Sequence, residues 1–160
     1  MASPLLLAVL ALLAPVRPET PTAIARRTMA TFRKAFLARN AEEIAANVTE
    51  DFTFVDVKGE KTRREFAIAE MRRGLARYKR VNRYDENLVT AKRVKEGVLM
   101  VTEAFLDVTV DAGGKLGHLV TTTRTESLLV PRGKGWAYRR IRLLSQSTTL
   151  PGGSMLDPQA

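Results

Sequence analysis

Residues 32–59 decide the fold, because the helix-like segment FRKAFLARNAEEI (32–44) gives way within a few residues to the strand-like segment TEDFTFVDVKG (49–59). The first segment continues an apolar pattern with a spacing near 3.6 residues, which is typical of an amphipathic helix. The second segment alternates in DFTFVDV (51–57), as a half-buried strand does, and Lys58-Gly59 turns the chain. The chain therefore changes here from helices to a sheet.

Two helices are predicted before this strand. Thr20-Pro21 opens the first, because a hydroxyl cap followed by proline at the first helical position favours a helix start. Its apolar face is made of Ile24, Met29, Phe32, Phe36 and Leu37. Asn40 ends this helix and caps a short second one, with Glu43 at the capping-box position. The second helix is expected to bury Ile44 and Val48.

One more helix and four long strands are predicted after the turn. Thr62, with Glu65 three residues later, forms a capping box that opens a helix to about Arg77. Runs of period two follow at 80–94, 98–111, 116–130 and 136–148, separated by glycine-containing turns. Helices followed by hairpin-connected strands predict an α+β domain, with three helices packed on a curved antiparallel sheet around a conical cavity.

The 160 residues are expected to form one domain over residues 20–150, with a leader and a tail. LLLAVLALLA (5–14) is too short to span a bilayer but suits the apolar core of a signal peptide within residues 1–19. Its alternative is an apolar helix docked on the domain. A signal peptide would make the protein periplasmic or secreted, and residues 151–160 are expected to be a flexible tail.

The composition excludes several kinds of site. The chain has no cysteine and one histidine, which removes disulfides, thiolate zinc sites, cysteine nucleophiles and paired-histidine metal sites. It also has no GxSxG elbow and no glycine-rich phosphate loop. We therefore expect neither a metal nor a cofactor.

The order of four segments resembles the nuclear transport factor 2-like superfamily, and in particular its SnoaL-like and ketosteroid-isomerase-like bacterial members. These segments are residues 32–44 and 49–59, TRREFAIAEM (62–71) and GWAYRRI (135–141), and the resemblance covers roughly residues 22–148. It implies a cone-shaped fold. Because that superfamily hosts many functions, it does not by itself imply an activity.

The resemblance supplies candidate catalytic residues. Asp56 stands where ketosteroid isomerases hold the aspartate that abstracts a proton, and a carboxylate in an apolar pocket could act as a general base. The family's acid position falls near Glu126, but its tyrosine position falls on Phe32, which lacks a hydroxyl and argues against that reaction. The alternative for Asp56 is a strand-end aspartate that accepts turn amides.

His118 is a third candidate base, with Glu103 or Asp107 as the carboxylate that orients it. The alternative is a surface histidine. Candidate ligand-binding residues are Phe32, Phe36, Phe54, Met71, Tyr78, Trp136, Tyr138 and Arg140. If the last strand has no bulge, Arg140 and Arg142 share a face with Trp136 and Tyr138 and would bind a carboxylate or phosphate. Otherwise these arginines are a solvated outer face.

Positive charge is concentrated in residues 61–83, which hold nine Lys or Arg and two Glu of a chain with net charge +9. Such a segment would attract an anionic surface, although the absence of a recognised motif argues against nucleic acid. A solvated helix face is the alternative. Strand 98–111 is apolar on both faces, which favours a homodimer through the sheet. The alternative is that a tail of the chain covers the second face.

These patterns favour an exported domain that binds a small apolar or anionic ligand, or a protein partner, without catalysis. The alternative is an isomerase, cyclase or dehydratase that uses Asp56 as general base.

Overall fold

The computed structural model describes residues 18–149. The predicted leader, apart from residues 18 and 19, and the predicted tail lie outside the described residues. Within the described part, no helix is long and apolar enough to cross a membrane. The helices are α2 (Pro21–Leu37), α3 (Ala41–Ala46) and α4 (Arg64–Arg77). The strands are β1 (Val48–Val55), β2 (Lys61–Arg63), β3 (Tyr78–Arg93), β4 (Val98–Ala112), β5 (Lys115–Arg132) and β6 (Gly135–Thr149).

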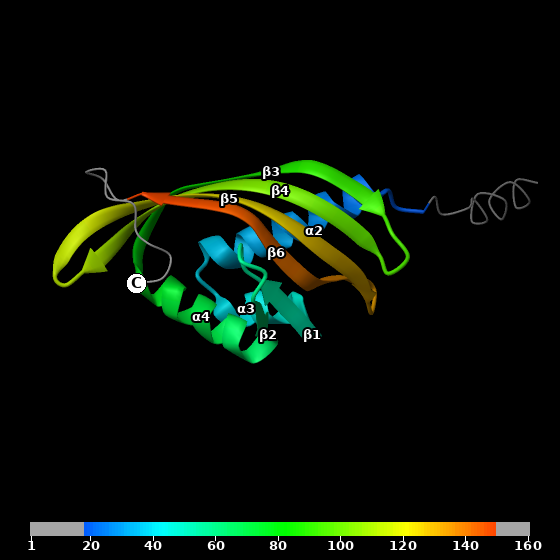
Figure 1. Cartoon of the computed structure of the whole chain (residues 1–160), viewed down its shortest axis with the longest axis horizontal. Helices are drawn as coiled ribbons and strands as arrows, with labels where there is room; N and C mark the ends of the chain where they lie inside the picture. The colour runs from blue at the N-terminus through cyan, green and yellow to red at the C-terminus, as the bar shows by residue number, and fades with distance from the viewer. Residues whose placement is uncertain (1–17, 150–160) are drawn as a thin grey trace, which may run out of the picture.

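The strands form one six-stranded sheet in the order β2-β1-β6-β5-β4-β3. The four long strands arch over the helices, which all lie on the concave side (Figure 1). Every neighbouring pair is antiparallel except β1 and β6, which are parallel. The prediction of a wholly antiparallel sheet was therefore wrong, because the last strand returns beside the first in the same direction.

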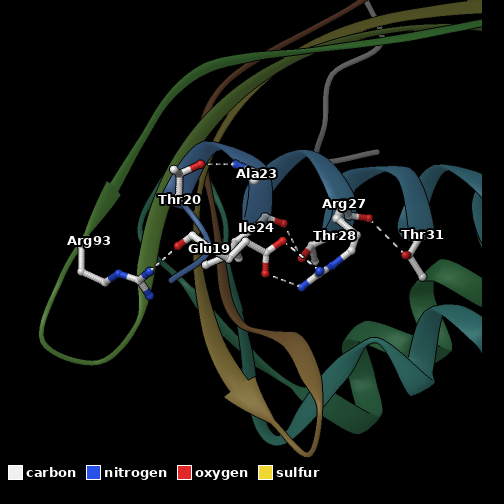
Figure 2. Close-up of polar contacts among 8 residues, drawn as sticks. All are labelled: Glu19, Thr20, Ala23, Ile24, Arg27, Thr28, Thr31 and Arg93. Atoms are coloured by element: carbon white, nitrogen blue, oxygen red, sulfur yellow. Dashed lines mark hydrogen bonds and ion pairs between the residues drawn. The ribbon is translucent and has the colours of Figure 1, made fainter. Parts of the chain in front are cut away.

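The start of α2 is anchored to the far end of the β3–β4 hairpin (Figure 2). Thr20 is the N-cap, and its Oγ1 accepts a hydrogen bond from the Ala23 N–H at 3.2 Å. Arg27 pairs with the Glu19 carboxylate at 2.8 Å, and Arg93 Nη2 donates to the Glu19 backbone oxygen at 3.0 Å. The predicted helix start is confirmed, and it holds α2 along the sheet.

The other predicted helix starts have different outcomes. Asn40 caps α3 by accepting from the Glu43 N–H at 3.1 Å, as predicted. The capping box at Thr62 was wrong, because Thr62 belongs to β2 and pairs with Phe54. The N-cap of α4 is Arg63, which makes no side-chain capping hydrogen bond.

The first strand begins earlier than predicted. Val48, assigned to the second helix by its apolar spacing, is the first residue of β1. The strand also ends at Val55, so Asp56 lies in the following turn. The shift arises because α3 ends at Ala46. The backbone oxygen of its C-cap, Asn47, accepts from the Tyr138 N–H at 2.9 Å and starts the pairing with β6.

Two apolar clusters hold the helices to the sheet. The larger one joins α2, β1 and α4 to the long strands and includes Ile24, Phe52, Met100 and Leu129. The smaller one consists of Ala35, Ile44 and Leu75, with Phe32, Phe36 and Met71 packed against it. This second cluster joins the three helices to one another on the concave side.

Strand β6 contains an irregularity that changes which side chains face the helices. Tyr138 pairs with Leu129, but Arg140 pairs with Leu128, so Arg139 is an extra residue in the ladder. A bulge of one residue reverses the alternation beyond it. Tyr138 therefore faces the concave side, and Arg140 faces the opposite side.

Candidate functional site

A cavity of about 490 Å³ lies between the concave face of the sheet and the helices. Six aromatic side chains line it: Phe32 and Phe36 from α2, Phe52 and Phe54 from β1, Tyr84 from β3 and Tyr138 from β6. Phe32 and Tyr138 contact each other edge to face, with ring centroids 5.7 Å apart. The cavity wall is therefore mainly apolar, and it is formed by elements distant in sequence.

The floor of the cavity is more polar because β5 presents a row of hydroxyls. Alternate residues of that strand line the cavity: Thr121, Thr123, Thr125 and Ser127. Thr125 lies opposite Thr102 of β4, and their Oγ1 atoms are 3.0 Å apart. Thr121 Oγ1 likewise lies 3.2 Å from Thr148 Oγ1 of β6. These hydroxyls offer hydrogen bonds without bringing charge into the cavity.

Glu86 of β3 is a half-buried acid in the cavity wall. Its Oε2 atom is buried and has no hydrogen-bond partner among the described residues. Burial raises the pKa of Glu86, and the hydroxyls of Tyr84 and Thr102 and the charge of Arg33 lower it only in part. Burial, together with the nearby Glu86, also raises the pKa of Tyr84 well above its usual range. The Tyr84 phenol is therefore neutral and can donate a hydrogen bond.

Solved structures of low sequence identity share this architecture, although no protein-family model and no curated protein matches the chain. A nuclear transport factor 2-like protein from Cytophaga hutchinsonii is 9% identical over 79% of this chain and 99% of that chain, with a TM-score of 0.57. A ketosteroid isomerase-like protein from Erwinia carotovora atroseptica is 11% identical over 85% and 96%, with a TM-score of 0.58.

A scytalone dehydratase-like protein from Novosphingobium aromaticivorans is 14% identical over 79% of this chain and 82% of that chain, with a TM-score of 0.61. The chain has a nuclear transport factor 2-like fold. The predicted resemblance is thus confirmed at the level of the fold. Identities this low carry no activity from those proteins to this one.

The nuclear transport factor 2-like fold brings five of the eight predicted ligand-binding residues to the cavity. These are Phe32, Phe36, Phe54, Met71 and Tyr138. Tyr78 is not among the lining residues and packs against Phe36, with ring centroids 6.4 Å apart. Trp136 packs on the larger apolar cluster, where Arg93 lies 5.5 Å from its ring centroid.

Arg140 is placed away from the cavity, contrary to the prediction that assumed a regular strand. The bulge at Arg139 turns Arg140 to the opposite face, where its Nη2 lies 3.6 Å from Glu126 Oε1. The residues that line the cavity include no arginine, so an anion would find no guanidinium there. The described structure gives no support to an anionic ligand at this site.

The three predicted catalytic residues are not brought together. Asp56 Oδ1 accepts backbone hydrogen bonds from Lys58 at 2.9 Å and Glu60 at 2.8 Å, which is the turn-capping alternative. Glu126 lies on the convex face beside Arg140. His118 is exposed, with its Nδ1 3.2 Å from Asp107 Oδ1. None of the three lines the cavity.

Sequence reasoning missed Glu86 and Tyr84, although a signal for them exists. Tyr84, Glu86 and Leu88 occupy alternate positions of one strand, so an acid stands between two apolar residues on one face. The structure places Tyr84 and Glu86 in the cavity wall and packs Leu88 against the larger cluster. An acid on an otherwise apolar strand face is therefore the sequence pattern that predicts a carboxyl group in the cavity wall.

The remaining surface and metal predictions have different outcomes. Within residues 18–149 no group of three or more His, Asp or Glu could hold a metal ion. In the segment 61–83, Arg72 pairs with Glu42, Arg73 with Glu70, and Arg83 with Asp85. These pairs reduce the free positive charge of the segment. Anion binding there and a homodimer through the sheet stay predictions.

The burial of Glu86 predicts a pH-dependent cost to stability. The pKa of Glu86 is raised in the folded state, so the folded protein binds this proton more tightly than the unfolded chain does. The stability gained from the protonated carboxyl is complete below the ordinary pKa of 4.5, and it is lost as pH rises through the raised pKa. We therefore expect Glu86→Gln to raise the melting temperature at pH 7 and to change it little at pH 4. Thermal unfolding followed by circular dichroism across this range checks the difference.

Glu103→Gln is the matched control, because it makes the same change at an exposed acid of the convex face that pairs with Arg124 at 2.7 Å. Exposed pairs contribute about 0–1 kcal/mol, so this variant should leave the melting temperature nearly unchanged. An equal effect of the two substitutions at pH 7 would contradict the claim that burial of the Glu86 carboxylate destabilises the folded protein.

Proposed function

We propose that the protein binds a small, largely apolar molecule in the cavity under the arched sheet. The observation that carries this proposal is the space of about 490 Å³ lined by six aromatic side chains. Protein interiors are otherwise packed with few voids larger than a water molecule. Cavities of about 300–1,000 Å³ lined mainly by apolar groups are typical of small-molecule sites.

The cavity lining also contains polar groups that could orient a ligand and select among ligands. Hydroxyls of β5 and the Glu86–Tyr84 pair stand among apolar side chains, which is the usual arrangement of a few polar groups that orient a ligand. The alternative derived from the sequence, proton transfer by Asp56, has no support in the geometry, because its carboxylate caps a turn outside the cavity.

A pair of threonines on β5 tests this function. Thr123 lines the cavity, whereas the adjacent Thr122 is exposed on the other face. We expect Thr123→Phe to fill part of the cavity and to weaken binding of the neutral fluorophore N-phenyl-1-naphthylamine at least tenfold. Thr122→Phe adds the same side chain outside the cavity and should bind the fluorophore like the wild type.

The readout is the rise in fluorescence on titration, with circular dichroism to show that both variants are folded. Binding that neither substitution changes would place the fluorophore elsewhere on the protein. No binding by the folded wild type would overturn the proposed function for ligands of this size.

A further inference from the structure

The charge of the cavity is opposite to the charge of the protein. The chain carries 26 Lys and Arg against 17 Asp and Glu. Among the described residues that line the cavity there are two acids, Glu70 and Glu86, and no Lys, Arg or His. Glu70 is exposed and pairs with Arg73, which leaves Glu86 as the half-buried acid whose Oε2 atom is buried without a partner. A positively charged group would therefore find its complement inside.

The unpartnered oxygen of Glu86 calls for a hydrogen-bond donor. A buried carboxylate oxygen without a partner costs free energy comparable to that of a lost hydrogen bond, and more when the group is charged. Thr102 already interacts with Thr125 at 3.0 Å, so the neighbouring hydroxyls are partly engaged. The hydroxyls of Tyr84 and Thr102 lie close enough to lower the pKa of Glu86, but no group of the described residues makes a hydrogen bond with Oε2. A ligand N–H would supply this hydrogen bond.

The aromatic lining adds a second attraction for a cation. Phe32, Phe36 and Tyr84 line the cavity together with Glu86, and Phe36 and Tyr84 have ring centroids only 4.8 Å apart. The face of an aromatic ring attracts a cation within about 6 Å of its centroid. The guanidinium of Arg33 makes such a contact from outside the cavity lining, because its Cζ lies 5.8 Å from the centroid of the Tyr84 ring.

We propose that the ligand is an apolar amine, bound as its protonated ammonium with an N–H donated to the Glu86 carboxylate and its apolar body among the phenylalanines. This proposal rests on the proposed function and specifies its ligand class. A carboxylate or phosphate ligand would meet two acids and no basic residue. A neutral ligand without a donor would leave the Glu86 oxygen unpaired.

The net positive charge of the protein does not oppose this assignment at physiological salt. Exposed charges are screened over about 8 Å at an ionic strength of 0.15 M, whereas a charge in a partly buried site is screened much less. The exposed Lys and Arg side chains should therefore affect the rate of entry more than the affinity.

Three ligands with one apolar body test the ligand class. They are 1-adamantylamine, 1-adamantanol and 1-adamantanecarboxylate, which are cationic, neutral and anionic at pH 7. In calorimetric titrations of the full chain we expect the amine to bind at least tenfold more tightly than the alcohol, and the carboxylate to bind most weakly. An alcohol or a carboxylate that binds as tightly as the amine would overturn the amine assignment while leaving the proposed function intact.

The role of Glu86 is tested by variants and by pH. Glu86→Gln should reduce the affinity for the amine to that for the alcohol and leave alcohol binding unchanged, whereas Glu103→Gln should leave all three affinities unchanged. In the wild type, the preference for the amine should disappear as acid protonates Glu86, which faces Tyr84 and Thr102 in the cavity and has the charge of Arg33 nearby, outside the lining. The pH series needs no variant, so it decides the question even if Glu86→Gln does not fold.

The failures of the two proposals are distinguishable. Amine preference that survives in a folded Glu86→Gln, or that persists below the pKa of Glu86, would overturn the role of this residue. If the folded wild type binds none of the three molecules, the proposed function fails for ligands of this size, and the ligand class fails with it.

Discussion

Replacing Gly97 with alanine should lower the free energy of unfolding by about 3 kcal/mol, because the new methyl group would overlap backbone atoms. A Cβ at this position would collide with the Leu129 carbonyl oxygen and lie 3.1 Å from the Leu129 carbonyl carbon and 3.2 Å from Val130 Cα. These atoms belong to β5, in the centre of the sheet, and cannot rotate away as a side chain could. Urea unfolding measures the loss.

Gly74→Ala is the matched control. This glycine lies inside α4, and a Cβ there would meet no atom within 4 Å. Alanine is favoured over glycine by about 1 kcal/mol in a helix interior, so this variant should be slightly more stable than the wild type. If the two glycine substitutions changed the unfolding free energy equally, the close approach of β5 to the β3–β4 hairpin would be contradicted.

Ile44→Ala should also lower the free energy of unfolding by about 3 kcal/mol, because it empties the small cluster that joins the three helices. The Ile44 side chain is 0% exposed and packs with Ala35 and Leu75. Phe32, Phe36 and Met71 pack against the same cluster and also line the cavity. We therefore expect this variant to lose affinity for the neutral fluorophore as well as stability.

Leu37→Ala removes an apolar side chain of similar size from the same helical layer, but Leu37 is 43% exposed. It should cost less than about 1 kcal/mol, because little buried surface is lost. Chemical denaturation of the two variants side by side checks the difference. Equal losses would show that the helical layer is not held by the Ile44 cluster.

The helical part of the fold could be predicted because its signals are local. Thr20 and Asn40 each cap a helix through their own side chain, and this chemistry depends on residues within three positions. Apolar spacing marks the long strands in the same way. Leu37 shows the limit, because it continues the apolar spacing at the helix end yet remains 43% exposed.

The parts that could not be predicted depend on contacts between distant segments. The parallel pairing of β1 with β6 joins residues about 90 positions apart. The sequence of neither strand indicates whether the two strands pair in parallel or antiparallel. The bulge at Arg139 follows from the register with β5, and it alone turns Arg140 to the convex face. One extra residue in a ladder thus removed a predicted ligand-binding residue from the cavity.

The candidate site shows the same division. Phe32, Phe36 and Phe54 were predicted as ligand-binding residues, and they do line the cavity. Asp56 was selected by analogy of position, but its carboxylate satisfies the turn amides that follow it. Burial raises the pKa of Glu86, and the cavity that Glu86 lines is formed by segments distant in the sequence, which local patterns do not show.

The most direct test of the central claim is a crystal structure of the protein with 1-adamantylamine. We predict the adamantane body inside the cavity, against Phe32 and Phe54, with its nitrogen at about 2.8 Å from a Glu86 carboxylate oxygen. An amine bound outside the cavity, or one inside it with its nitrogen turned away from Glu86, would contradict the account.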